Sequence, residues 1–108
     1  MLTRSRMRTM MQFIADNYKE KISLGDIAAS ASISKSEALR CFNSCVGMTP
    51  IKYLTARRLE KAAQLLLSTD DTVTRIAVEC GIDNISYFVR IFTAAFGITP
   101  KAYRQSIR

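Results

Sequence analysis

The chain has no histidine at any of its 108 positions. This absence removes the Ser-His-Asp and Cys-His pairs of nucleophilic catalysis, and it removes most ligand sets for zinc. The three cysteines are an odd number and follow no secretory signal, so a disulfide framework is not expected. No glycine-rich phosphate loop is evident either. The composition therefore argues against an enzyme and against a bound cofactor or metal.

Long apolar runs are also missing. No stretch approaches the roughly 20 apolar residues that span a bilayer. Residues 1–20 begin with positive charge, but Gln12, Asp16 and Asn17 interrupt the apolar part, which therefore lacks the core of a signal peptide. We expect a soluble, cytoplasmic protein with no membrane partner.

Acidic residues are scarce, because nine Asp and Glu stand against sixteen Lys and Arg. The net charge is +7 and the pI is about 9.7. In so small a chain this charge favours a polyanionic partner, and a merely basic soluble protein is the alternative. The 48% apolar content is that of an ordinary globular protein. The length suits one compact unit or two small subdomains that share a helix.

Two segments of the chain repeat one another. Residues 42–50 read FNSCVGMTP and residues 92–100 read FTAAFGITP. Five residues recur fifty positions later: Arg40, Phe42, Gly47, Thr49 and Pro50 correspond to Arg90, Phe92, Gly97, Thr99 and Pro100. Three upstream residues recur at a spacing of forty-nine: Ile27, Ala28 and Ile33 correspond to Ile76, Ala77 and Ile82. We infer one supersecondary unit used twice, with a turn that absorbs the one-residue difference.

Helical spacing of apolar residues continues along the chain, and no segment alternates with period two, so we predict an all-α fold. The expected helices, about seven in number, cover residues 6–19, 24–30, 34–46, 51–67, 73–80, 84–96 and 101–107. Residues 1–8 are expected to fray. Ser23 with Asp26 and Ser34 with Glu37 have the spacing of capping boxes. Further signals are a cap at Thr72, helix starts at Thr49-Pro50 and Thr99-Pro100, and a stop at Gly47.

Each repeat consists of a short helix, a tight turn and a second helix with one apolar face, which is the helix-turn-helix architecture. The small residues Ala28 and Ala77 allow the two helices to approach closely. In the first copy the expected apolar stripe is Ala38, Cys41, Phe42, Cys45 and Val46. In the second it is Phe88, Ile91, Phe92, Ala95 and Phe96. The outward faces are expected to carry Ser36, Leu39, Arg40 and Asn43, and Ile85, Ser86, Val89, Arg90 and Thr93.

This architecture suits DNA recognition. A helix fits the major groove, where its outward side chains meet base edges, and the preceding helix aims its N-terminal amides at phosphates. One such pattern is a weak signal, because short helix pairs are common. Two copies with a charge of +7 are a much stronger one.

The stretch GIDNISYFVRIFTAAFGITPKAYR (residues 81–104) resembles the C-terminal signature of AraC/XylS-type bacterial transcription regulators. Residues 22–50 resemble that family's first helix-turn-helix, and YLTARRLEKAAQLLL (residues 53–67) resembles its linker helix. The resemblance implies a DNA-binding domain over residues 1–108. Its first subdomain would cover about 6–48, its linker helix about 50–67 and its second subdomain about 72–107.

The resemblance further implies that recognition helices at about 34–46 and 84–96 enter successive major grooves, about 34 Å apart. Both reading heads lie on one polypeptide, so no dimer is needed to cover a site. The implied partners are promoter DNA and RNA polymerase, and the implied role is regulation of transcription, most often activation. No small-molecule site is evident in this segment.

Carrying the family's reading positions across gives eight candidate base-reading residues: Ser36, Leu39, Arg40, Ile85, Ser86, Tyr87, Val89 and Arg90. Arg40 and Arg90 are the strongest, because a guanidinium can donate two hydrogen bonds to guanine O6 and N7. The alternative for either arginine is an ion pair within the fold or a phosphate contact. The candidate phosphate contacts are Lys35, Lys52, Arg57, Arg75 and Lys101, each of which could instead be a solvated surface charge.

Three candidate readers are apolar: Leu39, Ile85 and Val89. Contact with thymine methyl groups is one interpretation. Alternatively, Leu39 packs into the core because its neighbour Ala38 is small, since the family usually has a large aliphatic residue at position 38 and a polar one at 39. Cys41 and Cys45 lie four positions apart, but no further ligands accompany them, so packing is preferred to a redox or metal function.

Several alternatives stay open at this point. The chain could be a stand-alone small regulator or the C-terminal domain of a longer, effector-responsive one. A protein-interaction module with a vestigial DNA-binding fold is the alternative function. The target sequence, the direction of regulation, any effector and the oligomeric state of the intact protein are not readable from the residues.

Overall fold

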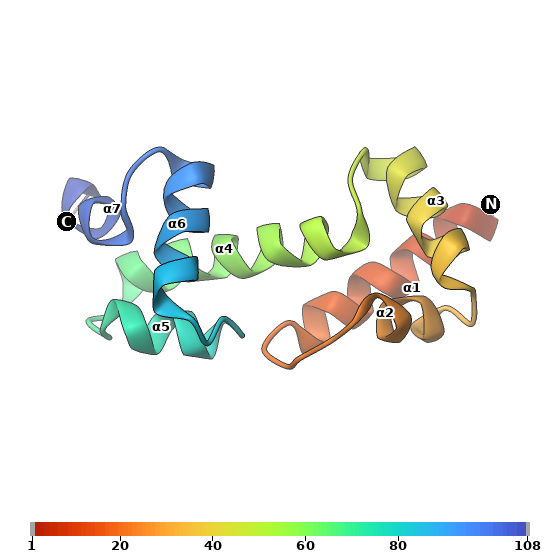
Figure 1. Cartoon of the computed structure of the whole chain (residues 1–108), viewed down its shortest axis with the longest axis horizontal. Coiled ribbons are helices and arrows are strands. Elements are labelled where there is room, and N and C mark those ends of the chain that lie inside the picture. Colours follow the sequence, from red (N-terminus) through yellow and green to blue (C-terminus); the bar gives the residue numbers. More distant parts are fainter. Residues whose placement is uncertain (1, 108) are drawn as a thin grey trace. The chain divides into compact units, whose positions relative to one another are not determined.

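A computed structural model describes residues 2–107, and that range contains seven α-helices and no strand. The helices are α1 (Leu2–Asn17), α2 (Leu24–Ser30), α3 (Lys35–Val46), α4 (Pro50–Ser68), α5 (Val73–Glu79), α6 (Ile85–Phe96) and α7 (Pro100–Ile107) (Figure 1). The predicted all-α fold is confirmed. Within the described range, no helix combines the length and the apolar character that crossing a membrane requires.

Helix α1 begins earlier than predicted. It starts at Leu2, so the expectation that this end frays is wrong for residues 2–8, and Met1 lies outside the described residues. Met7 and Met10 are buried in the core of the first unit described below. Because buried side chains hold its second and third turns, the helix persists to its first residues.

The predicted caps form in the structure, with one exception. Ser23 and Asp26 make a complete capping box around the first turn of α2. Ser34 Oγ accepts a hydrogen bond from the Glu37 amide at 3.1 Å, but the Glu37 carboxylate pairs with arginines instead of returning to the cap. The box predicted at α3 is therefore only half formed. Helix α6 begins at Ile85, and Asn84, predicted as its first residue, is its N-cap.

The chain divides into two units, Met1–Arg57 and Arg58–Arg108, and the division falls inside α4. In the first unit α1, α2 and α3 pack against one another (Figure 1). Its core contains Met10, Ile14, Ile27 and Phe42, together with Leu54 from the first half of α4. Packing of α1 and α2 against the buried face of α3 holds α3 in place.

In the second unit α6 packs against both α5 and α7. Its core contains Leu66 from the second half of α4, Ile76 from α5, and Phe88 and Phe92 from α6. Tyr103 of α7 meets Phe92 edge to face, with ring centroids 5.5 Å apart. This aromatic contact fixes α7 against the helix that carries the second set of candidate readers.

Several predicted core positions are exposed instead. Cys45 and Ala95 are exposed, and Phe96 keeps 38% of its surface accessible although its ring stacks on Phe92 at 4.4 Å. The buried part of α3 is limited to Ala38, Cys41 and Phe42. Both predicted stripes extended to the last turn of the helix, where few neighbours cover the side chains.

Candidate nucleic-acid interface

The two helix-turn-helix turns have the same backbone geometry. In the first, the Ile33 amide donates to the Ala28 carbonyl at 3.1 Å, and in the second the Ile82 amide donates to the Ala77 carbonyl at 2.9 Å. Both alanines are nearly fully buried, with 2% and 1% of their surface exposed. In both turns the amide of one residue donates to the carbonyl five positions earlier, which ends the short helix. The next helix then begins within a few residues. The internal repeat is therefore structural as well as sequential.

The one-residue difference between the copies lies in this turn, as predicted. In the first copy Ile33 directly precedes the N-cap Ser34. In the second copy Asp83 is inserted between Ile82 and the N-cap Asn84. Each cap then accepts a hydrogen bond from the amide three residues later, so both second helices start in the same way.

The outward face of α3 carries three candidate readers. Ser36, Leu39 and Arg40 are all exposed, and Leu39 has 39% of its surface accessible. The interpretation that Leu39 packs into the core is therefore wrong. The core is filled at this point by Ala38, which is fully buried.

Arg40 is held by an acidic side chain on its own helix. Its guanidinium hydrogen-bonds to Glu37 Oε1, and Glu37 Oε2 lies 3.7 Å from Arg6 Nη1 of α1. The hydrogen bond from Arg40 is the main cause that lowers the pKa of the Glu37 carboxyl. Arg40 nevertheless keeps 75% of its side-chain surface exposed. The ion-pair alternative for this arginine is thus realised, but on the exposed face of α3.

Burial raises the pKa of the Cys41 thiol, which also lies 3.9 Å from Glu37 Oε2. A neutral, buried thiol is a packing group, as the sequence indicated. Cys45, four positions later, is exposed.

The outward face of α6 differs from that of α3. Ser86, Tyr87 and Arg90 are exposed, whereas Ile85 and Val89 are half-buried against the core of the second unit. The expectation that these two side chains face away from the core is therefore only half right. The Arg90 guanidinium carbon lies 5.1 Å from the centre of the Tyr87 ring, within cation–π range.

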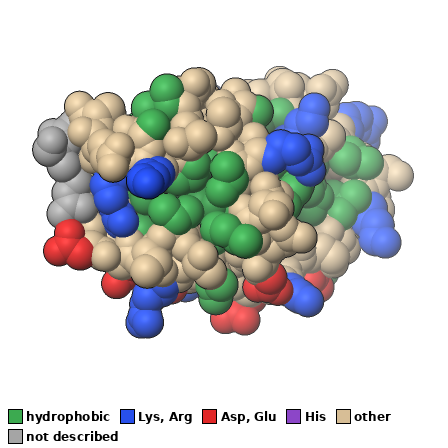
Figure 2. All heavy atoms as spheres, turned by 60° about the vertical axis from the view of Figure 1, so that its left-hand side comes forward, with side chains coloured by type: hydrophobic (Ala, Val, Ile, Leu, Met, Phe, Trp, Pro, Cys, Tyr) green, Lys and Arg blue, Asp and Glu red, His purple; other side chains and the backbone are tan. Residues whose placement is uncertain are grey.

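A groove of about 410 Å³ borders this part of α6. It is lined by Val73 and Thr74 of α5, Ile85 and Val89 of α6, and Thr99, Pro100 and Lys101 at the start of α7. The groove explains why Ile85 and Val89 are only partly covered. It places apolar side chains beside a lysine and the first turn of α7. Figure 2, turned toward the α7 side, shows apolar side chains at the surface with lysines and arginines around them.

Three of the five predicted phosphate contacts lie in first turns of helices. Lys35, Lys52 and Lys101 are exposed near the N-termini of α3, α4 and α7. The Thr49 and Thr99 hydroxyls cap α4 and α7 by accepting hydrogen bonds from the Lys52 and Ala102 amides, each at 3.1 Å. Lysines beside free helix N-terminal amides make surfaces that attract phosphate.

The other two candidates are arginines with neighbours of their own. Arg75 lies 3.2 Å from Glu79 and 3.9 Å from Asp71, so its charge is already compensated. Arg57 is exposed on α4.

Sequence reasoning assigned no site role to three residues. Glu37 was read only as a cap, although an acid three positions before an arginine on one helix is a recognisable ion-pair signal. Arg58 is half-buried in the second unit, where burial lowers the pKa of its guanidinium. Arg104 donates to the Leu66 carbonyl at 2.9 Å and to the Thr69 carbonyl at 3.2 Å. No local signal could have revealed contacts across 35 or more positions.

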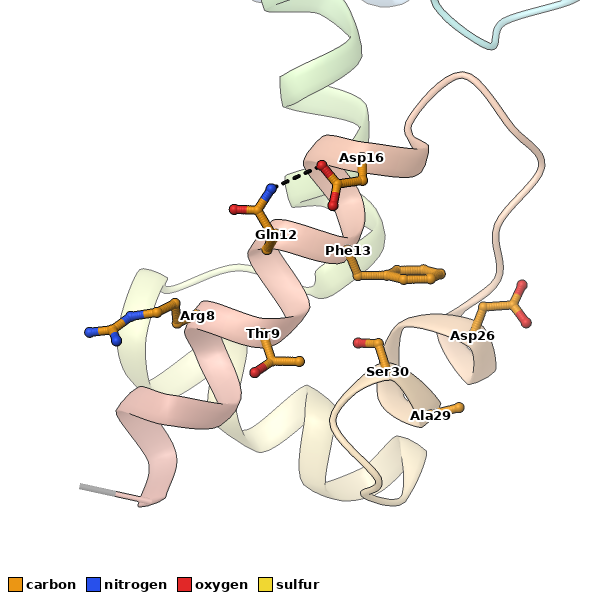
Figure 3. A pocket seen from close by; sticks show the side chains of 8 residues that line it. All are labelled: Arg8, Thr9, Gln12, Phe13, Asp16, Asp26, Ala29 and Ser30. Carbon is orange, nitrogen blue, oxygen red and sulfur yellow. Dashed lines mark hydrogen bonds between the residues drawn. The ribbon is translucent and has the colours of Figure 1, made fainter.

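The first unit also has an open groove of about 790 Å³ between α1 and α2 (Figure 3). Phe13 points into it, and a hydrogen bond joins Gln12 to Asp16 at its edge. The remaining lining residues are Arg8, Thr9, Asp26, Ala29 and Ser30. No residue of α3 lines this groove, so it is separate from the face that carries the candidate readers.

Two closed helix pairs of one geometry, each with an exposed arginine at the same place, define a helix-turn-helix protein of the DNA-binding class. The family described as helix-turn-helix domain matches residues 27–106. The chain belongs to the AraC-type branch of these helix-turn-helix transcription regulators, which is not a family of enzymes.

Relatives of known sequence cover nearly the whole chain. It is 34% identical over 105 residues to the uncharacterized HTH-type transcriptional regulator YdeC of Bacillus subtilis, covering 97% of this chain and 36% of that protein. It is 34% identical over 103 residues to the HTH-type transcriptional activator RhaS of Escherichia fergusonii, covering 95% and 37%. The chain thus spans about a third of the length of the curated relatives it matches.

Solved structures show the same fold. An AraC-type regulator from Chromobacterium violaceum superposes with a TM-score of 0.90 at 28% identity, covering 94% of this chain and 91% of that one. The DNA-binding domain of the global transcriptional factor AdpA, solved in complex with a target DNA, superposes with a TM-score of 0.87 at 27% identity, covering 92% and 89%.

Proposed function

We propose that this chain binds double-stranded promoter DNA by placing α3 and α6 in successive major grooves. The observation that carries the proposal is the repeated turn geometry, which presents Arg40 and Arg90 at the same position of two helices. The AdpA domain, which was solved on its target DNA, supports it by its similarity of fold. We further propose the division into a first subdomain (about 6–48), a linker helix (about 50–67) and a second subdomain (about 72–107).

In this proposal α3 reads bases through Ser36, Leu39 and Arg40, and α6 reads them through Ile85, Ser86, Tyr87, Val89 and Arg90. The two arginines contribute most, because a bidentate contact with guanine discriminates by roughly 1–3 kcal/mol. We expect Arg40→Ala and Arg90→Ala each to relax base preference at a different half-site, measured by selecting sites from random duplexes. Equal loss of affinity on selected and random DNA would reassign the arginine to a phosphate.

Phosphate contacts supply the general part of the affinity. Lys35, Lys52, Arg57 and Lys101 are exposed and suited to this role. The ion-paired Arg75 is a weaker candidate than the three lysines. If four phosphates are neutralised, log K falls by roughly 0.9 per contact, or about 3.6 per tenfold rise in salt. A gel shift on promoter DNA at increasing salt measures this slope. A flat response, or exclusive binding to protein, would instead favour the interaction module.

Apolar readers predict a preference for thymine. Leu39 is exposed on α3, and Ile85 and Val89 border the α6 groove, where a thymine methyl group can contact them. Replacing thymine by uracil at single positions of a selected site should weaken binding at the positions that these side chains reach. If uracil is tolerated at every position, the methyl contacts do not exist.

We propose that the chain works in the bacterial cytoplasm, where it regulates transcription together with RNA polymerase. We further propose that it activates transcription, because the relative RhaS is named an activator. In vitro transcription from a promoter that carries the selected site tests the direction of regulation. A fall in transcript on adding the protein would indicate a repressor.

A further inference from the structure

Each recognition helix holds its reading arginine with the residue three positions earlier. Glu37 precedes Arg40 on α3, and Tyr87 precedes Arg90 on α6, fifty positions later in both cases. In both copies the structure shows a contact between the two side chains. Both contacts attract the guanidinium, but only the carboxylate carries a negative charge that offsets it.

In the first copy a carboxylate partly offsets the charge of the arginine. Glu37 lies between Arg40 on its own helix and Arg6 on α1, and it keeps only 25% of its side-chain surface exposed. While this pair holds, the negative charge of Glu37 offsets part of the positive charge that Arg40 presents at the surface. A compensated guanidinium is a poor phosphate binder, but it still has donors for a base edge.

In the second copy the arginine keeps its charge. The Tyr87 ring orients the guanidinium by a cation–π contact at 5.1 Å. No ion pair of Arg90 with a carboxylate is found among residues 2–107. This arginine is free to bind a phosphate as well as a guanine.

We propose that Glu37 and Tyr87 are positioning residues that make the two reading heads unequal: Glu37 restrains Arg40 so that α3 contributes base discrimination rather than general affinity, whereas Tyr87 leaves Arg90 able to add general affinity. The inference rests on the proposed DNA binding and deepens it. It assigns to Glu37 a role in specificity that its place as a helix-cap residue does not suggest.

Moving Arg40 from Glu37 toward a guanine has a low cost. Glu37 Oε2 stays 3.7 Å from Arg6, so the carboxylate is not left without a cation when Arg40 shifts. A guanidinium has five N–H donors, and only one of its nitrogens donates to Glu37 here. The remaining N–H donors can hydrogen-bond to guanine O6 and N7 while the hydrogen bond to Glu37 still orients the guanidinium.

The test compares Glu37→Gln with Asp16→Asn. The second change removes the same charge from the same unit, but Asp16 accepts a hydrogen bond from Gln12 rather than from an arginine. Affinity is measured by fluorescence anisotropy on a duplex selected by the wild-type chain and on a random duplex. We expect Glu37→Gln to bind the random duplex roughly two- to fivefold more tightly than Asp16→Asn does, the size of one released surface ion pair. Its salt slope should rise by roughly 0.9, and its preference for the selected duplex should fall.

An Arg40→Gln background shows whether Glu37 acts through the arginine. In that background Glu37→Gln should have no more effect than Asp16→Asn, because no guanidinium remains to be released. If Glu37→Gln matches Asp16→Asn in the wild-type background as well, the positioning role is wrong. If it abolishes preference for one base pair in both backgrounds, Glu37 reads that base itself, and the positioning role is also wrong.

The mirror experiment introduces the carboxylate into the second head. Tyr87→Glu should lower affinity for the random duplex and reduce the salt slope by roughly 0.9 relative to Tyr87→Gln, because only the former neutralises Arg90. Identical slopes for the two variants would contradict the inequality of the heads.

A measurement without DNA separates this inference from the proposed function. In carboxyl-carbon NMR titrations, the pKa of Glu37 should be higher in Arg40→Gln than in the wild type, since the arginine lowers it. An unchanged pKa overturns the pairing whether or not DNA binds. If the pKa of Glu37 rises in Arg40→Gln as expected but the chain binds no duplex, the pairing is real. The proposed function and the role of Glu37 in it are then both overturned.

Discussion

Arg104 closes the C-terminal end of α4 from a helix that lies more than thirty positions further along the chain. Its Nε donates to the Leu66 carbonyl at 2.9 Å and its Nη2 to the Thr69 carbonyl at 3.2 Å. The last carbonyls of an α-helix have no partner within the helix, so an outside donor is needed. We expect replacement of this arginine to loosen α7 and the end of α4 together.

The expected magnitude follows from the two bonds. A hydrogen bond to a charged group contributes roughly 1.5–3 kcal/mol. Because Arg104 is half-buried and its second bond is long, we take the lower end and expect Arg104→Met to cost about 2–3 kcal/mol. Arg104→Lys can recover at most one bond, since an ammonium lacks the planar fork of the guanidinium, and should cost about 1 kcal/mol.

Urea unfolding measures these free energies, and amide hydrogen exchange locates them. In Arg104→Met we expect amide exchange to accelerate most in α7 and in the last turn of α4. Lys101→Met is the matched control, because it removes an exposed cation from the same helix and should change stability by less than about 0.5 kcal/mol. If Arg104→Met is no more destabilising than this control, the two hydrogen bonds do not hold α7.

Two further changes test the turn and the thiols. Ser32 has a left-handed φ of 56°, where the second copy has Gly81 at 88°. Ser32→Gly should therefore stabilise the first unit by about 0.5–1 kcal/mol in urea unfolding. Glycine removes the steric strain of a left-handed backbone, and this gain exceeds the conformational entropy that glycine loses on folding. A loss of stability would show that Ser32 is not strained. Of the three cysteines only Cys45 is exposed, so one thiol should react rapidly with an aromatic disulfide reagent, while Cys41 and Cys80 react only on unfolding. A fast reaction that persists in Cys45→Ser would contradict the burial of the other two.

Features that depend on a few neighbouring residues were predictable from the sequence. The caps at Ser23, Ser34 and Thr72 and the stop at Gly47 involve residues three to five positions apart, and the structure shows them all. Helical periodicity acts over the same range, which is why the seven helices were predicted to within a few residues. The one large error is the start of α1, where exposed residues 2–5 extend the helix before its first buried side chain, Met7.

The repeat and the family signature fixed the class of protein. The Gly-Ile-Thr-Pro segment and the repeated Arg, Phe and Gly positions can be read directly from the sequence. They recur because the same helix-turn-helix unit forms twice, with the same hydrogen bond in each turn. Arg40 and Arg90 are the leading candidate readers because they occupy the family's reading positions and a guanidinium can pair with guanine O6 and N7. Their roles on DNA stay predictions.

Only the tertiary structure decided what each exposed side chain contacts. Leu39 lies at the surface while Ala38 fills the core, and Ile85 and Val89 are half covered because α5 and the start of α7 lie beside them. Arg104 reaches the end of α4, and Glu37 contacts Arg6 of α1. Periodicity records which way a side chain leaves its helix, but burial and pairing depend on neighbours that folding brings from distant parts of the sequence.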